Sequence, residues 1–247
     1  MEAWDRPARW NIFRQGLRER RAQDFVLVSG EQIEPRLSPD ASWVLYWDYV
    51  EGGNEKSAPM RLMRIPISGG APEMVLQAAR EASVRCAPGH STCILSEPDR
   101  ANGELVFSSF DPQRGRIAEL IRLAADPAGL PAWDLSPDGS TLAIVDLDEH
   151  KDQIRLVELE SGSARAVSSG RSARLSGISR SADGRGWFVT SSSAREAAIL
   201  HVSLNGVVSK LWTTSTSVGT PLASPDGRNL AFVVSAYNSN AWSIENF

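Results

Sequence analysis

Short apolar runs recur along the chain, and clusters of polar turn residues separate them. In residues 135–146, LSPDGSTLAIVD, the turn residues Ser136-Pro137-Asp138-Gly139 stand just before the apolar run Leu142–Val145. Proline presets φ at the second turn position, Asp tolerates the third position, and Gly accepts a positive φ at the fourth. The phrase therefore predicts a type I turn in a β-hairpin, with residues 130–135 as the partner of a buried strand.

The same phrase recurs along the chain, once in a degenerate form. The other copies are Ser38-Pro39-Asp40-Ala41, Cys86-Ala87-Pro88-Gly89 (degenerate), Ser181-Ala182-Asp183-Gly184 and Ser224-Pro225-Asp226-Gly227. Their anchors, at positions 38, 87, 136, 181 and 224, are spaced by 43 to 49 residues. Periods of this length are typical of the four-stranded blades of a β-propeller.

The rest of each period predicts two further strands, so the fold class is all-β. We expect residues 1–247 to form a single β-propeller domain with five recognisable repeats, which leaves open a ring of six or seven blades. The innermost strands are predicted at 33–37, 82–86, 130–135, 175–180 and 219–223. The predicted segments are a partial blade at 1–32, repeats at 33–81, 82–129, 130–174 and 175–218, and an incomplete repeat at 219–247.

The two ends of the chain allow two interpretations of how the blades close. The start of the chain resembles the third and fourth strands of a blade, at residues 10–15 and 24–28. The end of the chain resembles strands one to three of a blade, at residues 220–223, 230–234 and 241–245. Either 24–28 completes the last blade, or the chain starts inside a blade whose first two strands lie upstream in a longer parent. The sequence favours the second interpretation.

Charge and hydropathy exclude some partners of this domain. The formal net charge is −4, so no basic face for nucleic acid is expected. The sequence contains no apolar run of transmembrane length and no signal peptide, which predicts no membrane insertion by this domain. We expect a monomer in isolation.

The repeats resemble the WD-like β-propeller repeats of the TolB type. Particular stretches are also similar to the C-terminal propellers of large bacterial sensor proteins with a serine/threonine kinase or a winged-helix domain: Val84-Arg85-Cys86, Cys93–Glu97, Phe110-Asp111-Pro112, Arg114-Gly115-Arg116 and Asn240–Phe247. The resemblance implies a sensory or protein-interaction role as the C-terminal part of a larger signalling protein. It also implies an extracytoplasmic (periplasmic) location, with a cytoplasmic one as the alternative. The kinase and winged-helix activities do not carry over, because this chain lacks those parts.

The sequence contains none of the common catalytic motifs. There is no G-x-S-x-G elbow, no phosphate-binding loop and no kinase signature, and the chain has three His residues without an obvious partner. We predict no catalytic residue, no metal site and no cofactor. The alternative is a propeller that belongs to a prolyl-oligopeptidase-like hydrolase, whose catalytic domain is a separate segment.

Two cysteines flank the degenerate turn. Cys86 and Cys93 occupy the positions that Leu135 and Leu142 hold in the repeat starting at residue 130. Opposed residues on antiparallel strands can approach the Cα separation that a disulfide needs. Two buried free thiols that fill a core are the alternative.

One column of residues, two positions before each turn anchor, can be compared across the repeats: Arg36, Arg85, Asp134, Ser179 and Leu222. These positions are predicted to lie beside the central channel, while Leu37, Cys86 and Leu135 face the packing. Arg36 and Arg85 are candidate ligands for an anionic group, because guanidinium groups match carboxylates well. The alternative is that one of them pairs with Asp134 in a structural contact. The ligand itself, a protein, a peptide or a small molecule, is not specified by the sequence.

Overall fold

The protein is built from β-strands. The computed structural model describes residues 11–16, 18–26, 31–49, 59–88, 93–125, 130–145, 151–170 and 173–235. In this part of the chain every regular element is a strand, and four of the sheets have four strands each. The all-β, four-stranded-blade prediction is therefore confirmed, and the fold is a β-propeller. No described segment forms a helix long and apolar enough to span a membrane.

The chain divides into two compact units. The first comprises residues 1–130, 135–142 and 157–164, and the second comprises residues 131–134, 143–156 and 165–247.

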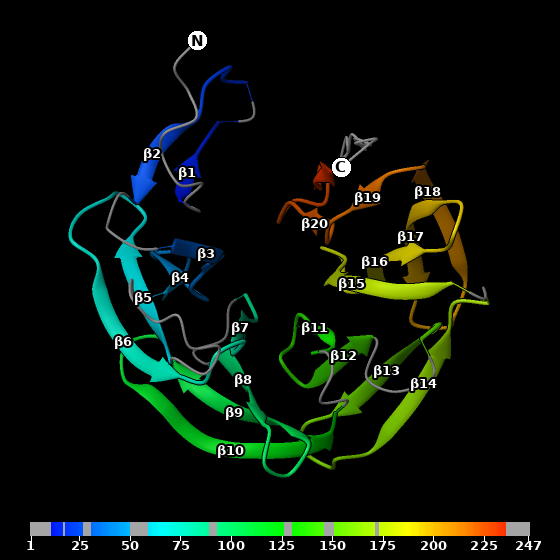
Figure 1. Cartoon of the computed structure of the whole chain (residues 1–247), viewed down its shortest axis with the longest axis horizontal. Helices are drawn as coiled ribbons and strands as arrows, with labels where there is room; N and C mark the ends of the chain where they lie inside the picture. The colour runs from blue at the N-terminus through cyan, green and yellow to red at the C-terminus, as the bar shows by residue number, and fades with distance from the viewer. Residues whose placement is uncertain are drawn as a thin grey trace, which may run out of the picture. The chain divides into compact units, whose positions relative to one another are not determined.

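The first unit holds two complete blades (Figure 1). In each blade the strands are hydrogen-bonded in chain order and antiparallel to their neighbours. The first blade consists of β3 (Glu31–Leu37), β4 (Trp43–Tyr49), β5 (Met60–Pro66) and β6 (Glu73–Ala78), and the second of β7 (Ser83–Cys86), β8 (Cys93–Asp99), β9 (Glu104–Asp111) and β10 (Gly115–Ala124).

The third and fourth blades follow the same order. The third consists of β11 (Ala132–Leu135), β12 (Thr141–Val145), β13 (Gln153–Glu158) and β14 (Ala164–Ser168), and the fourth of β15 (Arg174–Arg180), β16 (Gly186–Ser192), β17 (Ala197–Ser203) and β18 (Val208–Thr214). The fourth blade lies in the second unit, whereas residues of the third blade belong to both units.

Short two-stranded sheets stand at the two ends of the described chain. β1 (Ile12–Arg14) pairs with β2 (Gln23–Val26), β19 (Ser217–Val218) with β22 (Val234–Ser235), and β20 (Leu222–Ala223) with β21 (Leu230–Ala231). The predicted strand at 241–245 and the last residues of the predicted strand at 24–28 lie outside the described residues.

The recurring turn phrase forms the same hydrogen-bonded structure in four repeats, which we call the turn clasp. Its Ser hydroxyl donates to the Asp carboxylate two residues later, at 2.5, 2.5, 2.7 and 2.5 Å for Ser38, Ser136, Ser181 and Ser224. The same hydroxyl accepts the backbone N–H five residues later, at 3.0, 2.9, 3.0 and 3.0 Å. The fourth turn residue has a positive φ, between 55° and 72°, and is Gly except for Ala41.

The turn clasps also perturb their carboxyl groups. The Ser38 hydroxyl, followed by contacts from Ser42, lowers the pKa of Asp40 to about 2. Hydrogen bonds from the clasp Ser hydroxyl, then from the backbone N–H two residues after the Asp, also lower the pKa of Asp138, Asp183 and Asp226. A charged acceptor makes these bonds stronger than neutral ones, so each Asp fixes its hairpin in ionised form.

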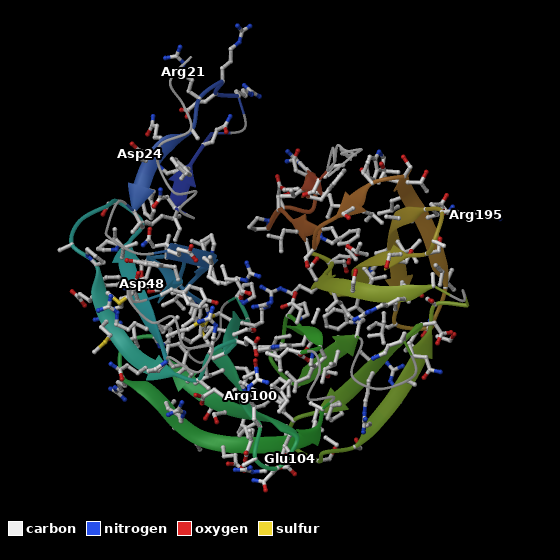
Figure 2. All side chains as sticks on the ribbon, in the orientation of Figure 1. Arg21, Asp24, Asp48, Arg100, Glu104 and Arg195 are labelled. Atoms are coloured by element: carbon white, nitrogen blue, oxygen red, sulfur yellow. A yellow bond between two sulfur atoms is a disulfide. The ribbon has the colours of Figure 1, made fainter. Side chains whose placement is uncertain are left out.

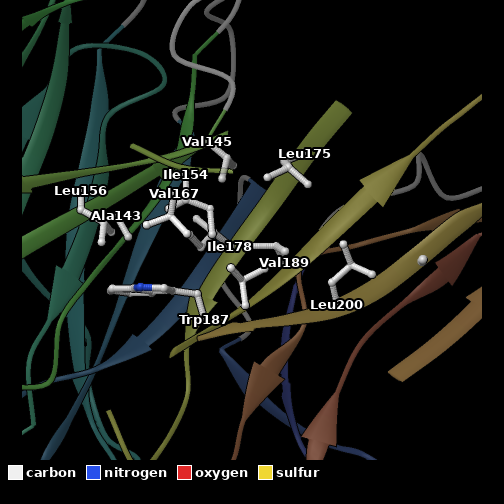
Figure 3. Packing of buried hydrophobic residues seen from close by; sticks show 12 residues of the cluster. Ala143, Val145, Ile154, Leu156, Val167, Leu175, Ile178, Trp187, Val189 and Leu200 are labelled. Carbon is white, nitrogen blue, oxygen red and sulfur yellow. The ribbon is translucent and has the colours of Figure 1, made fainter. Parts of the chain in front are cut away.

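Each unit has its own hydrophobic core. In the first, Leu45, Trp47, Met60, Leu62 and Phe110 are among the buried residues that pack around Cys86 and Cys93. In the second, the cross-strand partners Ile178 and Val189 lie together within a cluster of branched side chains and Trp187 (Figure 3). Buried β-branched and aromatic residues of this kind fill the space between packed sheets.

One packing prediction is wrong. Leu135 and Cys86 are 1% and 8% exposed, whereas Leu37, at the same repeat position, is 45% exposed. Leu37 pairs with Val44, just as Cys86 pairs with Cys93, so the register is the same. On this side of the first blade, the described hydrophobic cluster joins Val44 to Ile12, Phe25 and Val26 of β1 and β2, and Leu37 is not part of it.

Candidate arginine pocket

A large pocket lies in the first unit, where the first and second blades meet. Its volume is about 1210 Å³, and its lining comes from the connection between β6 and β7, the end of β8 and the start of β10. The lining residues are Pro59, Gln77, Ala78, Ala79, Arg80, Glu81, Glu97, Pro98, Arg100 and Arg116. Arg100, labelled in Figure 2, follows β8 directly. We call this site the arginine pocket.

Two of its three arginines are held by carboxylates. Arg100 forms an ion pair with Glu81, and Arg116 forms one with Glu97. The other oxygen of Glu97 accepts the backbone N–H of Ala79 at 3.3 Å. Glu81 has a φ of 71°, so the strand connection turns sharply at this residue. Both ion pairs line the pocket.

Arg80 is the third arginine, and its contact is with an aromatic ring. Its guanidinium carbon lies 5.0 Å from the centre of the Tyr49 ring, and the side chain is half-buried. Among the described residues Arg80 forms no ion pair. Burial raises the pKa of Tyr49, so this ring is neutral at ordinary pH. Three guanidinium groups and two carboxylates leave the pocket with one excess positive charge, at Arg80.

The two arginines of the predicted channel column make contacts within the first unit. Arg85 donates to the Val84 carbonyl at 2.8 Å and to the Ser83 hydroxyl at 3.3 Å, and lies 3.6 Å from a carboxylate oxygen of Glu34. Arg36 donates to the carbonyl of Pro35 at 3.0 Å.

Asp134, the third residue of that prediction, belongs to the second unit. It is 6% exposed; one carboxylate oxygen accepts the Arg180 backbone N–H at 2.8 Å and the other lies 3.7 Å from the Arg180 guanidinium. Asp134 therefore ties β11 to β15, a structural role. An anion site at Arg36, Arg85 and Asp134 stays a prediction.

Cys86 and Cys93 are cross-strand partners at the start of the second blade. The structure joins them in a disulfide with a Cα–Cα separation of 4.1 Å, and both residues are buried. The pair stands at the place where the other repeats have a turn clasp.

Arg122 on β10 forms ion pairs with three carboxylates of the second blade. Arg122 contacts Asp99 at 3.0 Å, Glu104 at 3.2 Å and Glu119 at 2.8 Å. Its contacts lower the pKa of Glu119, while Asn102 and then Arg122 lower that of Asp99. The described residues contain no group of His, Cys, Asp and Glu side chains suited to hold a metal ion.

The sequence did not point to Arg80, Arg100 or Arg116. They come from different positions of two successive repeats, so no single repeat contains all three arginines. The one available signal was the density of arginine between Arg114 and Arg122, which by itself predicts only a solvated strand face.

No protein-family model and no curated protein matches the sequence. Solved structures do match. TolB from Acinetobacter baumannii superposes with a TM-score of 0.68 at 18% identity, over 85% of this chain and 50% of that chain. The putative TolB from Agrobacterium tumefaciens gives a TM-score of 0.66 at 20% identity, over 91% of this chain and 76% of that chain. This chain thus spans half of the first protein and about three quarters of the second.

Enzymes also share the fold. Prolyl endopeptidase superposes with a TM-score of 0.54 at 12% identity, over 91% of this chain and 42% of that chain. At such identities the likeness shows the fold alone, so the chain is similar to TolB and to enzyme-associated propellers in architecture.

Proposed function

We propose that this chain is a non-catalytic binding domain that holds an acidic segment of a protein partner in the arginine pocket. The observation that carries the proposal is Arg80, a half-buried guanidinium group on the Tyr49 ring that forms no ion pair within the described residues. A carboxylate that enters the pocket would find a preoriented cation there, and Arg100 and Arg116 nearby.

The described Asp and Glu side chains with a shifted pKa all have it lowered. The carboxyl groups whose pKa is lowered belong to turn clasps or to the cluster around Arg122. A general acid or base works best with a pKa near the operating pH, which for a carboxyl group requires a shift upward. The perturbed carboxylates are thus suited to structural work.

The finer parts of the proposal rest on the sequence resemblance. They are a sensory or protein-interaction role within a larger signalling protein, and a location outside the cytoplasm. The predicted contacts of Arg36 and Arg85 with an anionic group are a separate proposal, because neither residue lines the arginine pocket, and Arg85→Ala in the assay below tests them.

The test is binding of a labelled hepta-glutamate peptide by fluorescence polarisation at 20 and 200 mM NaCl. We expect Arg80→Ala to weaken binding about tenfold at the lower salt concentration, the size of one lost charged hydrogen bond. The effect should shrink at the higher concentration, because exposed charges are screened.

Arg195→Ala is the matched control, since Arg195 is an exposed arginine of the second unit (Figure 2). Equal binding by the two variants would overturn the arginine-pocket proposal. Turnover of peptide or ester substrates by the wild-type chain would favour the hydrolase alternative instead.

A further inference from the structure

The two ion pairs of the arginine pocket differ in how firmly the carboxylate is held. The Glu97 side chain, paired with Arg116, is 19% exposed and also accepts the backbone N–H of Ala79 at 3.3 Å. The Glu81 side chain is 46% exposed, and its partner Arg100 is 58% exposed. Among the described residues, Arg100 is the one hydrogen-bond donor to the Glu81 carboxylate.

The pair of Arg100 with Glu81 is therefore the easier one to open. An exposed ion pair adds little to stability, because water solvates both charges well when they separate. A carboxylate of a ligand can replace Glu81 on Arg100, since the released side chain turns to solvent. The same exchange at Arg116 would take the Ala79 N–H from its acceptor, which is the costlier step.

The backbone of Glu81 indicates that its side chain has a role. Its φ of 71° lies in the left-handed region, where residues other than Gly are uncommon. Glycine adopts this conformation without strain, whereas a Glu holds it at a cost. Backbone strain of this kind persists mainly at binding sites and switches. The position thus carries a carboxylate where the backbone alone would favour glycine.

Displacement of Glu81 would leave two arginines of the pocket open to a ligand. Arg80 lies against the Tyr49 ring, and Arg100 would be released, while Arg116 stays paired with Glu97. Each open guanidinium group matches one carboxylate. The pocket in this state is suited to a ligand with two acidic groups.

We propose that Arg100 is a second carboxylate subsite, which Glu81 occupies in the free protein, and that the pocket selects segments with two acidic residues close together. Glu81 acts as an internal competitor, so a single carboxylate on Arg80 gains less than a pair that also displaces Glu81. This inference rests on the proposed function of the pocket, which requires Arg80 alone.

The test measures binding of labelled seven-residue peptides, blocked at both ends, to the full chain by fluorescence polarisation at 20 mM NaCl. One peptide has a single Glu in a Gly-Ser background, and three have two Glu residues one, two or three positions apart. We expect one two-Glu peptide to bind more tightly than the single-Glu peptide. Arg100→Ala should weaken that two-Glu peptide about fivefold, the upper range for one exposed ion pair, and the single-Glu peptide less than about twofold.

Glu81→Gln tests the displacement itself. It removes the internal carboxylate and should tighten binding of the same two-Glu peptide about fivefold. The gain should vanish when Arg100→Ala is added, because no arginine is then left to be released, whereas a general gain of positive charge would persist in that background. Glu81→Gly is a second variant: it should bind as Glu81→Gln does and melt at a higher temperature, since glycine relieves the left-handed backbone.

The matched control is Glu119→Gln, which removes the same charge from an exposed ion pair of the same unit, outside the pocket, and should leave the affinity unchanged. Equal effects of Glu81→Gln and Glu119→Gln would overturn the subsite at Arg100 and leave the proposal for Arg80 intact. So would a gain from Glu81→Gln that persists beside Arg100→Ala, or equal affinity of the wild type for the single-Glu peptide and every two-Glu peptide. Absence of binding by both the wild type and Glu81→Gln up to 1 mM would overturn both proposals.

Discussion

The two strands of the first hairpin are joined by different chemistry in the second and the fourth blade. In the fourth blade, Ser181 connects Asp183 to the Gly186 N–H across the turn. In the second blade the corresponding Ser and Asp are absent, and Cys86 and Cys93 join the two strands through a disulfide. The comparison shows that the repeat requires the two strand ends to be tied, and that the sequence phrase is one of two ways to tie them.

The two ties respond to different conditions. A disulfide acts mainly on the unfolded chain, which it constrains, and it is insensitive to pH. A turn clasp acts in the folded state through a charged acceptor, and it weakens when its Asp is protonated. Four experiments would break or sharpen this contrast.

Removal of the disulfide should have the largest effect. We expect Cys86→Ser with Cys93→Ser to lower the free energy of unfolding by about 2.5 kcal/mol, the loop-closure value for a loop of about eight residues. Urea unfolding of the variant measures the loss, and unfolding of the wild type in reducing agent should reproduce it. Two titratable thiols in the native, non-reduced protein would show that the free-thiol alternative is correct.

Removal of a buried turn clasp should have the next largest effect. Ser181 is 4% exposed, and Ser181→Ala leaves the buried Gly186 N–H without its acceptor. We expect a loss of about 1.5 kcal/mol in the free energy of unfolding, typical of an unsatisfied buried donor. Ser224→Ala is the matched variant in a more exposed turn, where water can replace the hydroxyl, and it should lose less than half as much. Equal losses would contradict a role for burial.

A turn clasp transplanted into the second blade should restore part of the stability lost with the disulfide. The spacing from Cys86 to Cys93 equals that from Leu135 to Leu142, so the turn has the same length. In the Cys-free background we expect Ala87→Ser, Gly89→Asp and His90→Gly together to recover about 1 kcal/mol, the value of a typical hydrogen-bonded turn. The same background with Ala87→Ser alone is the control, because its hydroxyl has no carboxylate partner. No recovery by the triple replacement would mean that the turn phrase acts only in its own repeats.

The sequence was sufficient for the repeated hairpins because the information that specifies them is local. Pro, Asp and Gly at fixed offsets dictate a turn wherever they occur, and the apolar run that follows dictates a strand. The exposure of Leu37 was not predictable in this way, since the burial of a strand residue also depends on what packs against its blade. The arginine pocket was missed for the same reason: Arg80, Arg100 and Arg116 meet only when two blades pack together.

Acid should have the smallest effect on stability of the four experiments. It should weaken the turn clasps and leave the disulfide-bonded hairpin unchanged. The pKa of Asp40 in the folded protein is about 2, below its ordinary value of 3.8, and the pKa values of Asp138, Asp183 and Asp226 are also lowered. A lowered pKa in the folded state means that the ionised clasp stabilises the protein fully above about pH 4. This contribution is lost as the pH falls toward 2, where the carboxyl groups take up protons. The four side chains are largely solvent-accessible, so the expected change in overall stability is small.

The acid effect is best measured at the clasps themselves. The Ser42 and Ser140 amides donate to Asp40 and Asp138 at 3.1 Å each, so the Ser42 NMR chemical shift should titrate near pH 2 and that of Ser140 below the ordinary range of an Asp. The Cys93 amide, in a hairpin without an Asp in its turn, should stay constant over this range. Asp138→Asn should abolish the titration at Ser140 and leave that at Ser42 unchanged, because the two clasps lie in different repeats. A Ser42 amide that titrates near pH 4, as an unperturbed Asp would make it, would show that the clasp does not hold its carboxylate in solution. The sequence phrase would then specify the shape of the turn alone, and the two ties would not differ in their response to acid.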